Sequence, residues 1–160
     1  MKNIMVRNIQ ESDFAEMLNI DQLVFDSSNT PAPMKQRSVE EYAGHYSSDK
    51  VFVAEVDNKV AGYIGSHNPT GLASNSHVLE LYIAVHPDFQ GLGVGRALME
   101  HLNSWARQQG FLKISLRVLA SNEGAIAFYY SNGFQEQGRL VKEFLLNGTY
   151  VDDILMYKLL

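Results

Sequence analysis

The chain of 160 residues contains no cysteine, which excludes disulfides, thiolate metal sites and a cysteine nucleophile. It also has no apolar run near the roughly 18 residues that a membrane-spanning helix needs. Acidic residues outnumber basic residues, with 18 Asp and Glu to 13 Lys and Arg, and the formal net charge is -5. Sequence-independent binding of nucleic acid requires a basic surface that displaces counterions from phosphates. We therefore expect no nucleic-acid partner and no membrane partner.

The chain does have enough apolar residues for a folded core. Hydrophobic residues make up 46% of it and charged residues 19%, a composition that argues against general disorder. The length suits one compact domain, which we expect to cover residues 1–160. The segment Met1–Arg7 lacks the apolar core of a signal peptide, so we expect a cytoplasmic protein.

Hydrophobic periodicity switches between two and 3.6 residues, which predicts interleaved strands and helices in an α/β domain with a mixed sheet. Asp13 with Glu16, and Ser38 with Glu41, have the spacing of helix capping boxes. A turn at Asn147-Gly148 is the strongest hairpin signal in the chain. The other expected elements are strands at 4–9, 50–56, from 60, at 77–85 and at 111–118, and helices that start near residues 94 and 122.

The most informative stretch is Gln90-Gly91-Leu92-Gly93-Val94-Gly95-Arg96, between the predicted strand 77–85 and the next predicted helix. Backbone N–H groups at a helix N-terminus are unpaired, and the positive end of the helix dipole favours an anion there. Three alternate glycines allow positive φ angles and close approach of the backbone to a ligand. The stretch therefore predicts a main-chain site for a diphosphate.

Three interpretations of this stretch compete. A P-loop requires Gly-Lys-Ser/Thr, and no Lys-Ser/Thr pair follows the glycines here. A dinucleotide fingerprint requires glycine where Arg96 stands and an acidic residue about 20 positions later, where Lys113 and Ile114 stand. The pattern Gln-x-x-Gly-x-Gly is satisfied by Gln90, Gly93 and Gly95.

This last pattern resembles the GNAT superfamily of acyl-CoA-dependent N-acyltransferases, and the order of elements is similar over nearly the whole chain. The resemblance implies a single α/β domain with a mixed, mostly antiparallel sheet of about seven strands and about four helices. It implies acetyl-CoA (coenzyme A) as co-substrate, with the diphosphate on the loop amides and the pantetheine arm on main-chain groups of the preceding strand. The implied cofactor-binding residues are Ile83, Val85, Gln90, Gly91, Leu92, Gly93, Val94, Gly95, Arg96 and Asn122.

A second segment supports the resemblance. The run from Asn122 through Ala125 and Tyr129 to Gly133-Phe134 is similar to the family's Asn-x-x-Ala…Tyr…Gly-Phe pattern. Helical spacing places Asn122 and Tyr129 on one face. The resemblance implies that Asn122 holds the cofactor and that Tyr129 reaches the sulfur. The competing interpretation is a helix cap and a core aromatic residue.

Acetyl transfer to an amine sets two proton requirements. An ammonium of pKa about 10.4 must lose a proton before attack, and a thiolate of pKa about 8.5 must gain one. Without cysteine, direct attack in a ternary complex is the simplest scheme. We expect Tyr129 as the acid and Glu80 as the base, unless a bulge turns Glu80 away, with His77 or water as substitutes. We expect no metal site.

The acceptor is less well determined. Family members vary their acceptor pocket in the region matching residues 26–37 and in the terminal hairpin, where Asp152 or Asp153 could attract a cationic amine. The expected function is acetylation of a primary amine on a small molecule, or on a peptide or protein N-terminus. The alternatives are a non-catalytic acyl-CoA sensor and a nucleotide-phosphate binder. Strand edges at the terminal hairpin make a homodimer reasonable.

Overall fold

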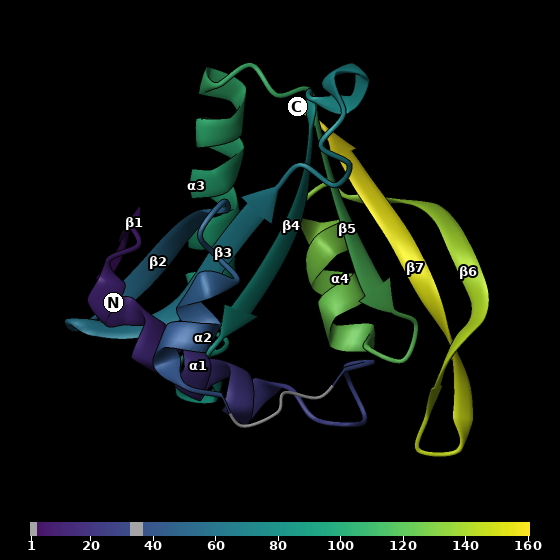
Figure 1. The fold of residues 1–160 in the computed structure, drawn as a ribbon, viewed down its shortest axis with the longest axis horizontal. Coiled ribbons are helices and arrows are strands. Elements are labelled where there is room, and N and C mark those ends of the chain that lie inside the picture. The colour runs from purple at the N-terminus through teal and green to yellow at the C-terminus, as the bar shows by residue number, and fades with distance from the viewer. Residues whose placement is uncertain (1–2, 33–36) are drawn as a thin grey trace.

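The computed structural model describes residues 3–32 and 37–160, which form a seven-stranded sheet and four α-helices (Figure 1). The strand order is β1-β2-β3-β4-β5-β7-β6, and only β4 and β5 are parallel neighbours. This mixed, mostly antiparallel sheet confirms the expected fold class. The strands are β1 Ile4–Asn8, β2 Lys50–Val56, β3 Lys59–His67, β4 Val78–Val85, β5 Lys113–Leu119, β6 Gln135–Leu146 and β7 Thr149–Leu159. The helices are α1 Phe14–Val24, α2 Val39–Gly44, α3 Val94–Gln108 and α4 Glu123–Ser131.

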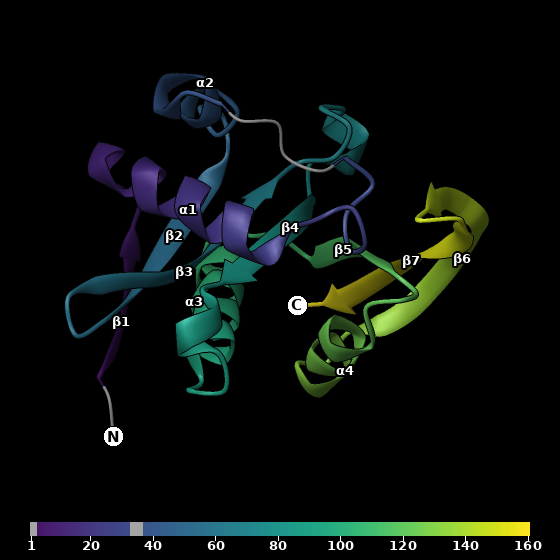
Figure 2. The same ribbon diagram turned by 90° about the horizontal axis from the view of Figure 1, so that it is seen from below.

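Helices cover both faces of the sheet. Figure 2 shows α1 and α2 on one face and α3 and α4 on the other. Leu79 and Leu81 of β4 join the buried core beneath α3 and α4, whereas Ala84 joins the core beneath α1 and α2. The register between β3 and β4 has no shift, so the expected facing of the β4 side chains is confirmed and no bulge intervenes. Burial of apolar side chains on both faces fixes the position of β4 in the middle of the molecule.

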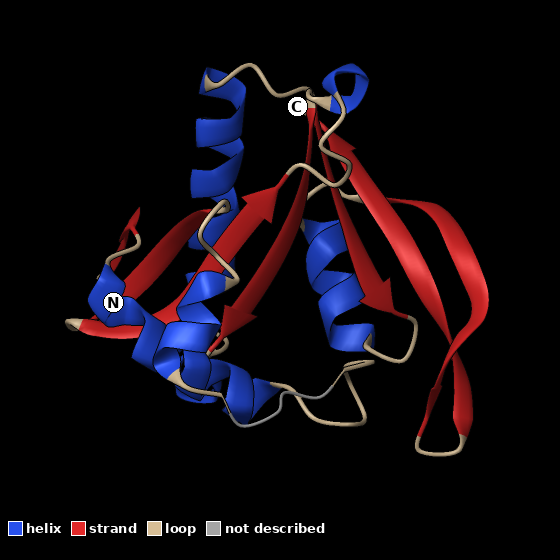
Figure 3. Cartoon of the chain, viewed as in Figure 1, coloured by secondary structure: helices blue, strands red, loops and turns tan. Residues whose placement is uncertain are grey.

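The parallel pairing of β4 and β5 is short. Val78–Glu80 pairs with Lys113–Ser115, and beyond this β4 continues only with β3 and β5 only with β7. The two strands therefore diverge toward their carboxyl ends, and α4 lies beside the gap, as the strands and helices of Figure 3 show. A gap at the carboxyl ends of parallel strands is where ligands bind in open α/β sheets. The divergence thus positions the candidate site.

The terminal hairpin forms as predicted. Asn147 and Gly148 have φ angles of 48° and 82° and connect β6 to β7. Ser38 accepts the N–H of Glu41 at 3.2 Å, which confirms it as the cap of α2.

The expected cap at Asp13 is wrong. Asp13 makes no side-chain bond to the first turn of α1, which follows directly on a 3₁₀ turn at Glu11–Asp13. Its carboxylate instead accepts the N–H of Gln10 at 2.7 Å and a hydrogen bond from Arg7 at 2.8 Å. Arg7 lies on β1, and the two charge-assisted bonds that it donates to this carboxylate hold it toward the sheet.

Some expectations fall partly on undescribed positions. Met1 and Lys2, at the start of the segment tested for a signal peptide, and residues 33–36, in the region 26–37 expected to vary the acceptor pocket, lie outside the described residues. In the described ranges, none of the helices combines the length and the apolar character required to cross a bilayer.

Candidate active site

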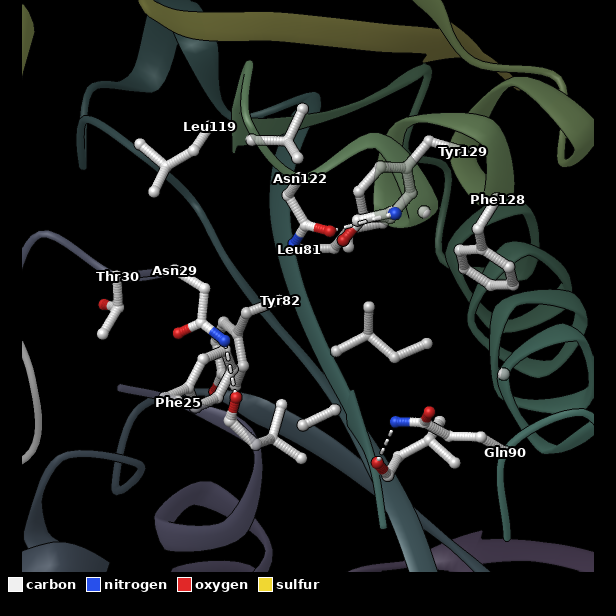
Figure 4. A pocket seen from close by; sticks show the side chains of 18 of the residues that line it. Phe25, Asn29, Thr30, Leu81, Tyr82, Gln90, Leu119, Asn122, Phe128 and Tyr129 are labelled. Carbon is white, nitrogen blue, oxygen red and sulfur yellow. Dashed lines mark hydrogen bonds between the residues drawn. The ribbon is translucent and has the colours of Figure 1, made fainter. Parts of the chain in front are cut away.

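A cavity of about 1150 Å³ opens where β4 and β5 diverge. Its walls come from the second half of both strands, the turn before α3, the start of α4 and the segment after α1. Figure 4 shows Asn122 and Tyr129 entering from the side of α4, with Phe25 and Asn29 on the opposite side. A cavity of this size, with few polar side chains, suits an extended organic ligand.

The turn before α3 presents a row of unpaired backbone N–H groups. Gly91 and Gly93 have φ angles of 75° and 88°, and Gly93 is the N-cap of α3. No N–H of residues 91–96 donates to a described residue, and the first donor of the helix is Ala97, to Gly93 at 3.0 Å. Only glycine adopts such positive φ angles without strain. The turn therefore presents a row of main-chain donors, and its binding of a diphosphate stays a prediction.

Gly95 has a different reason for being glycine. It lies inside α3 without a positive φ angle, and a Cβ atom there would lie 3.1 Å from the ring of Phe128 on α4. Gly95 therefore lets α3 and α4 approach each other closely. The expectation that all three glycines take positive φ angles is wrong for this one, because helix packing and not turn geometry requires it.

The outer edge of β4 is free beside the cavity. The N–H of His86 donates to Ala61 of β3 at 2.8 Å, and backbone groups alternate between the two edges of a strand. The main-chain groups of Ile83 and Val85 therefore point to the opposite edge, where β5 no longer pairs. Gln90 donates its Nε2 to the Val85 carbonyl at 3.3 Å, which ties the turn to the strand. The edge at Ile83 stays available to a ligand.

Tyr129 and Asn122 both line the cavity. Tyr129 is 8% exposed, and its hydroxyl bonds to no group within residues 3–32 and 37–160. Burial raises the pKa of Tyr129 to about 12, so the hydroxyl is protonated at neutral pH. Asn122 caps α4 by accepting the N–H of Ala125 at 3.2 Å, and its Nδ2 has no partner in the described part of the chain. Asn122 is thus a helix cap whose amide N–H groups still face a ligand site.

Glu80 lies elsewhere. It stands at the narrow end of the gap, where it pairs with His67 of β3 and Ser115 of β5, and it does not line the cavity. Tyr82, two residues further along the same face of β4, lines the cavity instead, and its hydroxyl donates to Asp49 at 2.7 Å. His77 does not line the cavity either. The role of Glu80 as base stays a prediction, and its position argues against direct contact with an acceptor.

The wall that β5, β6 and β7 contribute, here called the far wall, carries two charged side chains. They come from strands that are neighbours in the sheet and far apart in the sequence. Arg117 of β5 donates through Nε and Nη2 to Oδ2 of Asp153 on β7, both at 2.5 Å, and both residues line the cavity. Asp152 faces away and accepts the N–H of Lys142 on β6 at 2.8 Å. Adjacent strand residues point to opposite faces, so only one of the two aspartates can reach the cavity. The sequence suggests both aspartates as groups that attract the acceptor. It gives no indication that Arg117 joins them, because the partner of Arg117 is 36 positions away.

Among the residues that the structure describes, no group of three His, Asp or Glu side chains is placed to hold a metal ion. The polar groups that the cavity presents include Tyr129, Asn122 and the Arg117–Asp153 pair.

The model of the acetyltransferase (GNAT) family matches residues 14–134, which include the glycine turn and Tyr129. The chain belongs to the GNAT family. The family that the sequence resembles is thus confirmed. The crystal structure of smu.2055 from Streptococcus mutans UA159 has the same fold. It aligns with a TM-score of 0.90 and 27% identity over 96% of this chain and 98% of that one.

Two relatives from Escherichia coli strain K12 are N-acetyltransferases whose names state different acceptors. The chain is 52% identical over 54 residues to ribosomal protein bS18-alanine N-acetyltransferase, a match that covers 34% of this chain and 36% of the relative. It is 33% identical over 116 residues to spermidine N(1)-acetyltransferase, over 70% of this chain and 59% of the relative. The matches thus span between a third and three fifths of these relatives' own length.

Proposed function

We propose that this GNAT protein transfers an acetyl group from acetyl-CoA to a primary amine while both substrates are bound. The observation that carries the proposal is the row of unpaired N–H groups at residues 91–96, at the mouth of a cavity with a free strand edge. A diphosphate satisfies such amides, and an amide-containing arm can pair with such an edge. The names of the relatives, which acetylate a protein alanine or spermidine, support acetyl transfer to an amine.

The residues present fit acetyl-CoA. Nothing lies within 4 Å of a Cβ built on Gly91, so the space above the turn is open to a diphosphate. The main chain of Ile83 and the N–H of Val85 would pair with the pantetheine arm, since Gln90 already occupies the Val85 carbonyl. The free Nδ2 of Asn122 would donate to the same arm.

Tyr129 is the proposed acid. Acetyl-CoA supplies an acetyl thioester, and the thiolate released from it, with a pKa near 8.5, must gain a proton. The Tyr129 hydroxyl holds its proton at neutral pH and faces the cavity without a described partner, so it donates that proton as the C–S bond breaks. The acceptor ammonium loses two protons as its nitrogen bonds to the acetyl carbon. One of them restores the Tyr129 hydroxyl, and the other leaves to solvent.

Water within the cavity removes the first proton from the ammonium in this scheme. Glu80 acts on that proton only through intervening water, because it lies beyond the cavity wall.

Release of free thiol from acetyl-CoA, measured against a panel of amines, tests the proposal. We expect amine-dependent release and binding of coenzyme A in calorimetry. Binding without release for any amine would indicate an acyl-CoA sensor, and ATP competing as well as coenzyme A would indicate a nucleotide-phosphate binder. Absence of any coenzyme A binding would overturn the assignment of the turn.

A further inference from the structure

The far wall of the cavity holds a buried carboxylate that is only half satisfied. Asp153 is 4% exposed, and both bonds from Arg117 go to the same oxygen, Oδ2. Within residues 3–32 and 37–160, no group hydrogen-bonds its other oxygen, Oδ1, and none bonds Nη1 of Arg117. Oδ1 is not among the described buried atoms that lack a partner, so water or a ligand in the cavity can reach it. The pair therefore has one acceptor, Oδ1, and one donor, Nη1, that no described residue uses.

The charges around the pair restrict what that ligand can be. Of the described residues that line the cavity, Arg96, Arg117 and Asp153 are charged. Arg96 belongs to the turn before α3, where its side chain pairs with Glu100 on the surface, so the far wall carries one positive and one negative group. A polyamine carries several positive charges, whereas this wall offers it a single carboxylate, Asp153, which is already paired with Arg117. A ligand with one ammonium and one carboxylate matches the pair in charge.

The surroundings of the pair are apolar. Phe144 of β6, Leu119 of β5 and Phe25 after α1 line the same cavity. Leu119 is the cross-strand partner of Asp153, so an apolar side chain of a bound ligand would lie against this wall.

We propose that Arg117 and Asp153 recognise the acceptor as a free α-amino acid with an apolar side chain. The amino group donates to Oδ1 of Asp153, and the carboxylate accepts from the free edge of Arg117. This inference rests on the proposed acetyl transfer and specifies its acceptor. It predicts that the acceptor is neither a polyamine nor the N-terminus of a protein, because neither carries a carboxylate next to the amine.

The test compares L-leucine, L-methionine and L-phenylalanine with their carboxamides, and with spermidine and a peptide that begins with alanine. Thiol release should be at least about 10-fold more efficient, in kcat/KM, for each amino acid than for its amide. Arg117→Gln should remove this preference by lowering the value for the acids only. Asp153→Asn should lower kcat/KM about 10-fold or more for acids and amides alike, with an unchanged KM for acetyl-CoA.

Asp152→Asn is the matched control, because Asp152 is the neighbouring carboxylate that faces away from the cavity. It should leave the ratio of acid to amide unchanged. If a single variant fails to fold, the double variant Arg117→Gln/Asp153→Asn retains a neutral hydrogen-bonded pair. That variant should bind coenzyme A and treat leucine and leucinamide alike.

Equal use of acid and amide by the unaltered protein would overturn the inference, and so would preferred use of spermidine or the peptide. In those cases the proposed acetyl transfer would stand. Calorimetric titration of leucine into the protein with coenzyme A separates the two ideas. Leucine binding that depends on Arg117, without turnover of any amine, would overturn the proposed function and leave the recognition of amino acids intact.

Discussion

The cavity has two arms that are built from different parts of the chain. The donor arm consists of main-chain groups within residues 83–96, one continuous segment from β4 to the start of α3. The proposed acceptor arm consists of the side chains of Phe25, Arg117, Phe144 and Asp153, from three strands and the segment after α1. A main-chain site depends on backbone conformation and tolerates changes of side chain. A side-chain site can change its ligand without any change in the fold, which is how one family can keep a donor and vary its acceptors.

Tyr129 belongs to neither arm and is the proposed acid, so its replacement should have the largest effect. Tyr129→Phe removes the proton donor and should lower kcat about 100-fold while the affinity for coenzyme A stays unchanged. Thiol-release kinetics and calorimetry measure the two quantities. Tyr130→Phe is the matched control, since Tyr130 is the next residue and is 52% exposed. Full activity of the Tyr129 variant would show that another group protonates the sulfur.

Binding of coenzyme A by the donor arm should depend on the backbone conformation of the glycine turn. Gly93→Ala places a Cβ on a residue with φ of 88°, and should weaken coenzyme A binding about 10-fold because the amides shift. Gly71→Ala introduces the same strain at φ of 71° in the loop between β3 and β4, away from this cavity. Both variants should lose similar thermal stability, and only the first should lose affinity in calorimetry. Equal affinity in the two would refute the main-chain site.

Glu80 should have a smaller effect than either of these. From its place beyond the cavity wall it reaches the acceptor only through water, so Glu80→Gln should lower kcat less than about 5-fold. Steady-state kinetics at saturating amine measure this. A loss as large as that expected for Tyr129→Phe would instead establish Glu80 as the base.

The smallest effect expected is that of alkaline pH on the Tyr129 hydroxyl. Burial raises the pKa of Tyr129 to about 12, so this group remains protonated and active while the pH rises toward 10. Over the same range the acceptor amine loses its proton, so kcat should rise or level off between pH 7 and 10. Rates corrected for spontaneous thioester hydrolysis would show this. A decline with a midpoint near 9, absent in Tyr129→Phe, would mean that the hydroxyl ionises too early.

The difference between the arms also explains what could be predicted. The donor arm follows from local rules: positive φ angles favour glycine at positions 91 and 93, and a helix N-terminus leaves its amides unpaired. The same rules predict the hairpin at Asn147-Gly148. They fail at Asp13, whose carboxylate binds Arg7 of another element. They also fail at Gly95, which is glycine because Phe128 lies against it.

The amino-acid order alone determined the alternation of strands and helices, the glycine turn, the face on which Asn122 and Tyr129 stand, and with them the family. These depend on residues close together in the chain, whose conformational preferences act locally. Only the tertiary structure decided that Glu80 lies off the cavity, that Asp153 faces it and Asp152 does not, and that Arg117 meets Asp153. Those outcomes depend on where β4 leaves β5 and on how β7 is registered beside β5, which long-range pairing sets.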